Sequence, residues 1–106
     1  MRIPTAIQRY VDFTNSQDWA ALAATFSAKA VVHDEGGVHT GRTEIAMWAR
    51  ASIQKYDMEI QPLSLREGAT NSVLTAVVAG NFPGSPAELT FQFQLKGDEI
   101  VALKIG

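Results

Sequence analysis

Asp34 is the residue whose position best suits acid–base chemistry. It follows the apolar pair Val31 and Val32 and stands just before Gly36 and Gly37. Valine favours an extended backbone, and alternation along a strand would place Val32 and Asp34 on the same face. If Val32 faces the core, the inward carboxylate needs a partner, a cavity or a proton. Because the glycines end the strand, the sequence predicts Asp34 at the mouth of a pocket, where burial would tune it as a general base.

Two other interpretations of Asp34 stay open from spacing alone. The carboxylate could cap the glycine turn, or it could pair with Arg42. His33 is adjacent on the predicted strand and should face the opposite way, which argues against a catalytic pair with Asp34. The two histidines and two acidic residues over 33–39 lack the regular spacing of metal ligands. We therefore expect no metal site, and we expect no cofactor.

Tyr10 is the second candidate, because its hydroxyl can donate a hydrogen bond from a helix. It shares helical spacing with Ile3, Ile7 and Thr14. This alignment fits either a hydroxyl that points into a pocket or an ordinary core residue with a solvated tip. The side chains expected to contact a ligand are large and apolar, although such residues usually fill a core: Trp48, Phe91, Phe26, Met58 and Trp19.

Helices are predicted in the first half of the chain. Apolar residues recur at helical spacing over 3–14 and again over 19–26, where Asp18 would lie in the first turn. Thr40 is suited to cap a third helix. A short strand over 30–34, which carries the candidate base, precedes that helix.

The second half of the chain switches to the period of strands. Residues 58–65 predict a strand that is bent or bulged at Pro62. Residues 73–80 are apolar at nearly every position, which is typical of a strand covered on both faces. Residues 89–96 alternate strictly, and a hairpin turn leads into a last strand over 100–105. The pattern indicates an α+β fold in which helices cover one face of a mostly antiparallel sheet.

The whole chain of 106 residues is expected to form one domain over 1–106. Its apolar fraction of 46% and charged fraction of 19% are typical of soluble globular proteins. A net charge of −2 argues against nucleic acid or an anionic membrane as a partner. We expect no signal peptide and no membrane span, and the cytoplasm is the default location. The lack of cysteine excludes a disulfide framework and a thiolate nucleophile.

The order of these elements resembles the nuclear transport factor 2-like superfamily, which includes SnoaL-like polyketide cyclases and ketosteroid isomerases. The similarity covers nearly the whole chain, and its anchors are Gln8-Arg-Tyr-Val11, Ala30-Val-Val-His-Asp34, Gly41-Arg-Thr-Glu-Ile45 and Gly97-Asp-Glu-Ile100. The resemblance implies a cone-shaped, curved and mostly antiparallel sheet wrapped around about three helices of the first half. A curved sheet of this kind leaves a hollow, where pockets are common.

The resemblance to ketosteroid isomerase implies roles for two residues. Asp34 would be the general base that moves a proton, and Tyr10 would donate a hydrogen bond to the developing oxyanion. Phe91 takes the place of a second donor and can donate nothing. The implied function is cofactor-free proton transfer on a small hydrophobic carbonyl compound, of isomerase, lyase or cyclase type.

Two alternatives to catalysis stay open at this point. The same hollow could bind a small hydrophobic molecule without chemistry, which the apolar Phe91 favours. The protein could instead be an interaction module whose hollow is filled core. In either case, the polar sheet face of Thr90, Gln92 and Gln94 suits a homodimer contact or plain solvent. We expect a homodimer through this face.

Overall fold

Helices and strands are mixed only in the first half of the chain. This computed structural model describes residues 2–106, and over that range it contains three helices and six strands. The helices are α1 (Thr5–Asn15), α2 (Trp19–Ala24) and α3 (Gly41–Tyr56). The strands are β1 (Phe26–Asp34), β2 (Gly37–Thr40), β3 (Glu59–Glu67), β4 (Asn71–Ala79), β5 (Ala87–Lys96) and β6 (Glu99–Ile105). Everything after α3 is strand and turn, as the switch in periodicity predicts.

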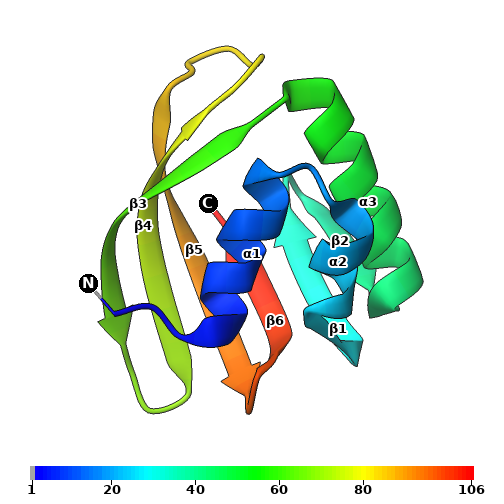
Figure 1. Ribbon diagram of the computed structural model, residues 1–106, viewed down its shortest axis with the longest axis vertical. Coiled ribbons are helices and arrows are strands. Elements are labelled where there is room, and N and C mark those ends of the chain that lie inside the picture. The colour runs from blue at the N-terminus through cyan, green and yellow to red at the C-terminus, as the bar shows by residue number, and fades with distance from the viewer. Residues whose placement is uncertain (1) are drawn as a thin grey trace.

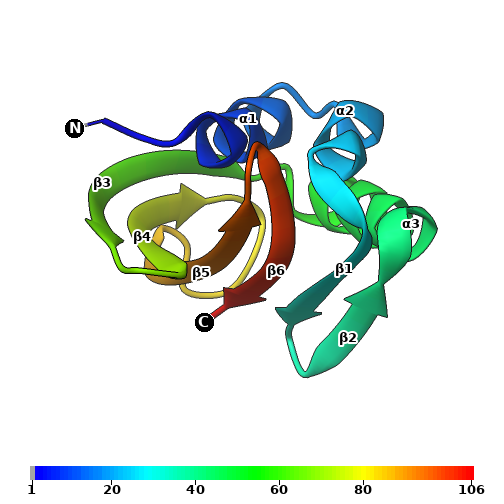
Figure 2. The same ribbon diagram turned by 90° about the horizontal axis from the view of Figure 1, so that it is seen from below.

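One sheet joins the strands in the order β2-β1-β6-β5-β4-β3. β1 and β6 run parallel, and the other neighbouring pairs are antiparallel. The sheet curls strongly, as the end-on view of Figure 2 shows, and the helices lie along one side of it (Figure 1). The predicted α+β fold, a curved sheet wrapped around helices of the first half, is confirmed.

α1 is held against the sheet by one apolar face and by its last residue. Its buried residues are Ala6, Ile7, Tyr10, Val11 and Thr14. The Asn15 side chain donates to the main-chain carbonyl of Ile60 at 2.9 Å and accepts from the Ile60 amide at 2.7 Å. The sequence predicts Asp18 in the first turn of α2, but in the structure Asp18 is the N-cap just before that helix. Its carboxylate accepts from the Ala21 amide at 3.1 Å and so pairs one of the free N–H groups at the helix start.

β1 and β2 form a hairpin where the sequence predicts only a glycine turn. Glu35 (φ 52°) and Gly36 (φ 76°) both adopt positive φ, which lets a two-residue turn match the twist of its strands. Asp34 and Gly37 face each other across this turn. β2 is not predicted from the sequence because it is only four residues long, which is too short to show alternation. β1 also begins earlier than predicted, at Phe26.

β4 alternates between two faces instead of being covered on both. Its buried residues are Ser72, Leu74, Ala76 and Val78, whereas Val73, Thr75 and Val77 between them are half-buried. The prediction of two covered faces is wrong because the helices cover only one side of the sheet. The irregularity predicted at Pro62 is confirmed, since the pairing register of β3 with β4 shifts between Pro62 and Ser64.

Arg42 does not pair with Asp34, which removes one of the alternatives for that carboxylate. Its guanidinium donates to the main-chain carbonyl of Phe26 and to the carboxylate of Glu99, each at 2.9 Å.

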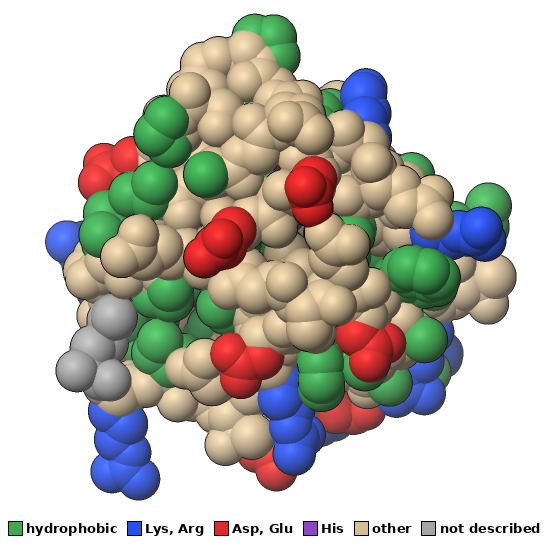
Figure 3. Space-filling view, turned by 45° about the horizontal axis from the view of Figure 1, so that its top comes forward, with side chains coloured by type: hydrophobic (Ala, Val, Ile, Leu, Met, Phe, Trp, Pro, Cys, Tyr) green, Lys and Arg blue, Asp and Glu red, His purple; other side chains and the backbone are tan. Residues whose placement is uncertain are grey.

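Figure 3 shows acidic side chains standing apart from one another on one face of the molecule, without a single charged patch. Within residues 2–106, no helix has the length and apolarity to cross a membrane.

Candidate functional site

A hollow of about 410 Å³ lies between α1, α3 and the inner face of the sheet, and we call it the inner hollow. Its polar lining residues are Tyr10, Asp34, Glu35, Ser52 and Tyr56. Its apolar lining residues are Trp48, Met58, Val78, Phe82, Pro83, Leu89, Phe91 and Ile105. The structure therefore brings together five residues that the sequence nominates: Asp34, Tyr10, Trp48, Phe91 and Met58.

Two nominated residues, Phe26 and Trp19, lie outside the lining of the inner hollow. Phe26 is fully buried, and its ring meets the Tyr10 ring edge-on at a centroid distance of 6.3 Å. Phe26 therefore packs against the Tyr10 ring without lining the hollow. Trp19 is on α2, where the guanidinium of Arg50 lies 5.5 Å from its ring centroid. The candidate site does not include either residue.

Asp34 ends β1 half-buried, with its carboxylate turned toward α3. The indole Nε1 of Trp48 donates to its Oδ2 at 3.1 Å. Burial raises the pKa of Asp34 above its usual value, and the neighbouring charge of Glu35 adds to the rise. The hydrogen bond from Trp48 and the charge of His39 act in the opposite direction on this pKa. A carboxylate with a raised pKa is a stronger base than a solvated one, and its hydrogen bond fixes its orientation.

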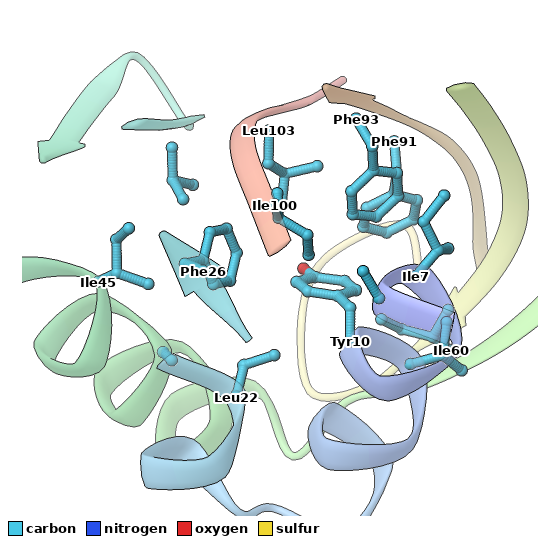
Figure 4. Packing of buried hydrophobic residues seen from close by; sticks show 14 of the residues in the cluster. Ile7, Tyr10, Leu22, Phe26, Ile45, Ile60, Phe91, Phe93, Ile100 and Leu103 are labelled. Atoms are coloured by element: carbon cyan, nitrogen blue, oxygen red, sulfur yellow. The ribbon is translucent and has the colours of Figure 1, made fainter. Parts of the chain in front are cut away.

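Tyr10 reaches the inner hollow from α1 and is only 2% exposed. Its ring packs against those of Phe91 and Phe93 at centroid distances of 5.9 and 5.4 Å (Figure 4). Burial raises the pKa of Tyr10 well above its usual value, the charge of Asp34 adds to this, and the Thr14 side chain opposes it. The hydroxyl therefore stays protonated and can only act as a neutral donor or acceptor.

The Tyr10 hydroxyl has no hydrogen-bond partner among the side-chain bonds of residues 2–106. Thr14 donates instead to the Tyr10 main-chain carbonyl, at 2.8 Å. Over the same residues, no fully buried side-chain nitrogen or oxygen is left without a partner. Since the Tyr10 side chain lines the inner hollow, its hydroxyl is placed to donate a hydrogen bond to a ligand oxygen there.

Phe91 lines the same wall and is also 2% exposed. It stacks on Phe93 with ring planes 18° apart, and both rings contact Tyr10. Since a phenyl ring has no polar hydrogen, this wall offers a ligand oxygen the single donor of Tyr10.

Three further polar residues of the site were not nominated from sequence. Tyr56 donates from its hydroxyl to Oε1 of Glu35 at 2.9 Å, and Ser52 lies beside it in the lining. Trp48, Ser52 and Tyr56 follow one another at intervals of four residues, so they share one face of α3. The sequence contains this helical spacing, so the shared face of α3 could have been predicted. It does not show the hairpin that brings Glu35 against the end of α3.

A second hollow of about 320 Å³, which we call the outer hollow, adjoins the inner hollow. It shares Asp34, Glu35, Trp48, Ser52 and Tyr56 with the inner hollow and adds Gly37, His39, Ala51 and Lys55. The hydrogen bonds Trp48–Asp34 and Tyr56–Glu35 thus join α3 to the hairpin through four residues that line both hollows. The rings of His39 and Trp48 lie 5.9 Å apart, centroid to centroid.

No group of three or more His, Asp or Glu side chains within residues 2–106 is arranged to hold a metal ion. His33 is exposed, while His39 faces α3. What the site offers is two carboxylates, three hydroxyls and an indole N–H around an apolar space. These groups suit proton transfer and hydrogen bonding.

The SnoaL-like domain family matches residues 7–103 of the chain. A comparison with curated proteins gives no match. Among solved structures, a proposed polyketide cyclase from Sinorhizobium meliloti is 35% identical, with 98% of this chain and 95% of that chain covered and a TM-score of 0.93. A protein of ketosteroid isomerase-like fold from Catenulispora acidiphila, in complex with trimethylamine, is 18% identical, with 99% and 86% covered and a TM-score of 0.88.

A second proposed polyketide cyclase, from Xanthomonas campestris, is 17% identical, with 94% of this chain and 85% of that chain covered and a TM-score of 0.79. At that identity, as with the Catenulispora protein, the likeness is one of fold. The match over 7–103 and the Sinorhizobium relative carry the assignment further. The chain belongs to the SnoaL-like domain family, within the nuclear transport factor 2-like superfamily.

Proposed function

We propose that the protein catalyses cofactor-free proton transfer on a small carbonyl compound with an apolar body. One observation carries the proposal: a half-buried carboxylate with a raised pKa and a protonated tyrosine hydroxyl line the same apolar hollow. A base and an oxyanion donor on one cavity are the two groups that such a reaction needs.

In this reaction Asp34 is the base and Tyr10 the donor. The Asp34 carboxylate takes a proton from the carbon next to the carbonyl group, and the electrons of that C–H bond move to the carbonyl oxygen. Tyr10 donates a hydrogen bond to the resulting enolate. Return of the proton at another carbon completes an isomerisation. Attack of the enolate carbon on a second carbonyl, with the proton delivered to that oxygen, closes a ring instead.

Phe91 limits how fast such a site can work. Loss of one oxyanion donor typically costs about 10²–10³ in rate. A single donor is sufficient when the carbonyl is already activated, for example between two carbonyl groups. The family relationship to proposed polyketide cyclases supports substrates of that kind.

The proposal is tested first with ligands that mimic an enolate. Phenols and naphthols are titrated into wild-type protein and into Tyr10→Phe, which keeps the ring and loses the hydroxyl. We expect binding to weaken about tenfold in the variant, or 1.4 kcal/mol. Equal binding to both proteins would contradict the role of Tyr10.

Proton transfer itself is measured as exchange of α-hydrogens for deuterium in a panel of ketones, including β,γ-unsaturated ones. Asp34→Asn should abolish catalysed exchange while leaving the binding of naphthol nearly intact. Non-catalytic binding is the second candidate function, favoured by Phe91 in the oxyanion wall. It predicts tight binding of the same ligands with no exchange in wild type.

A homodimer through the sheet face of Thr90, Gln92 and Gln94 is part of the proposal. Gln92 and Gln94 are exposed in the single chain, and half-buried Val73 lies opposite Gln92 on β4. A face that mixes amide and aliphatic groups is suited to pairing with a second copy. The molar mass in solution tests this proposal. The cytoplasmic location stays a prediction.

A further inference from the structure

The charged side chains that line the inner hollow are both acidic, and an apolar carbonyl compound carries no positive charge to pair with them. Asp34 and Glu35 are its acidic lining residues, and among its described lining residues none is Lys, Arg or His. The Glu35 carboxylate accepts from the Tyr56 hydroxyl and forms no ion pair with any other residue of 2–106. A ligand with positive charge would be attracted by both carboxylates.

Three aromatic residues lie near the two carboxylates. Trp48 and Tyr56 each direct their polar hydrogen to one of the carboxylates, at 3.1 and 2.9 Å, and Phe82 meets the Tyr56 ring edge-on at 5.9 Å. The faces of such rings attract cations, best of all in Trp and Tyr. Tyr56 already shows this, because the Lys55 ammonium lies 5.1 Å from its ring centroid.

The buried end of the hollow, at Tyr10, offers a hydrogen-bond donor and no negative charge. The Tyr10 side chain is 2% exposed and lines the hollow, and its hydroxyl can donate a hydrogen bond to an acceptor oxygen on the ligand. The two ends together describe one molecule with an oxygen at one end and a cation at the other.

We propose that the substrate class of this site is a carbonyl compound that carries an ammonium group, primary to quaternary. This inference rests on the proposed function and adds the charge of the substrate to it. The ammonium group lies against Glu35 and the rings of Trp48 and Tyr56, the reacting carbon lies next to Asp34, and the carbonyl oxygen accepts from Tyr10.

Two basic groups oppose this arrangement from the outer hollow, Lys55 and His39. Lys55 and Glu35 are both exposed, so water and salt screen both charges, whereas the attraction of the half-buried Asp34 is screened less. The Lys55→Met variant should therefore strengthen the binding of a cation slightly. It serves as the matched control for variants that remove negative charge.

The test uses two phenols of equal shape, 3-(trimethylammonio)phenol and 3-tert-butylphenol, titrated calorimetrically below the pKa of both. We expect the cation to bind wild type about tenfold more tightly than its neutral partner. Glu35→Gln and Tyr56→Leu should each remove most of that preference, whereas Tyr56→Phe, which keeps the ring, should retain more of it than Tyr56→Leu. The binding of 3-tert-butylphenol should be unchanged in Glu35→Gln, which also shows that the variant is folded.

Equal affinity of wild type for the two phenols would overturn the inference, as would a preference that survives Glu35→Gln. These outcomes are distinct from failure of the proposed function. If 3-tert-butylphenol binds and weakens in Tyr10→Phe while the cation gains nothing, proton transfer on a neutral substrate stands and the ammonium group is wrong. If neither phenol responds to Tyr10→Phe, the proposed site itself is wrong.

Discussion

The inner hollow has two regions built in opposite ways. Around Tyr10 the wall is aromatic and continuous with the core: Phe91 in the lining is 2% exposed, and Phe26, which packs on the Tyr10 ring outside the hollow, is 0% exposed. Around Asp34 the wall is half-buried, and Glu35, in the hairpin turn, is exposed with positive φ. The first region belongs to the core of the fold, whereas the second is held by two side-chain hydrogen bonds between α3 and the hairpin.

This difference matches the demands on the two proposed catalytic groups. A donor to an oxyanion works best neutral and shielded from water, since water would compete for the oxyanion and weaken its field. A base must exchange its proton with a substrate and must ionise near neutral pH, so full burial would hold it protonated. Tyr10 and Asp34 are placed accordingly. Variants in the first region should therefore act on stability, and variants in the second should act on proton affinity.

The largest effect is expected for Phe26→Ala, in the core beside Tyr10. Removal of a fully buried phenyl ring typically costs about 3–5 kcal/mol of unfolding free energy, because apolar contacts are lost and a cavity remains. Urea denaturation of the two proteins measures the difference. Phe82→Ala is the control, since Phe82 is only half-buried at the edge of the hollow and should cost clearly less. Equal losses would mean that the two regions do not differ as described.

A smaller effect, dependent on pH, is expected for Asp34→Asn. The folded carboxyl has a raised pKa, so between the unfolded value of 3.8 and the folded one the native state binds more protons than the unfolded state. The free energy of unfolding of wild type therefore falls as pH rises through that window, and Asp34→Asn removes this part of the fall. The difference, variant minus wild type, should increase with pH in urea titrations. A difference that stays constant or decreases with pH would contradict the raised pKa. Water screens the half-buried group, so the effect should stay below that of Phe26→Ala.

The same contrast explains what the sequence could and could not predict. Tyr10 and Phe91 lie on a periodic helix and an alternating strand, where the pattern of apolar residues fixes which side faces the core. Asp34 could be placed because it continues the alternation of Val32. Glu35 and Tyr56 could not, because their contact depends on the turn angles at Glu35 and Gly36 and on where α3 ends. No periodicity encodes those two features.

Trp19 is a residue that the sequence predicts as a ligand contact and the structure places outside the site. Both tryptophans stand on predicted helices with an apolar face, and the sequence favours Trp48 because its helix directly follows the glycine turn. Tertiary structure excludes Trp19: α3 packs along the hairpin that carries Asp34, whereas Trp19 on the short α2 lies beside Arg50. An indole N–H acquires a function only where the fold supplies an acceptor.

The smallest effect on stability, and the most specific on the base, is expected for Trp48→Phe. The variant keeps an aromatic ring and loses the N–H that donates to Asp34, which lowers the pKa of that carboxyl. The pKa of Asp34 should therefore rise further, and the acid limb of the exchange reaction should move to higher pH. Carbon-13 titration of the side-chain carboxyl measures the first effect without a substrate. Trp19→Phe is the matched control and should change neither quantity. If both variants moved the Asp34 titration equally, the 3.1 Å bond would have no particular part in setting its basicity, and the half-buried wall would act on the base by desolvation alone.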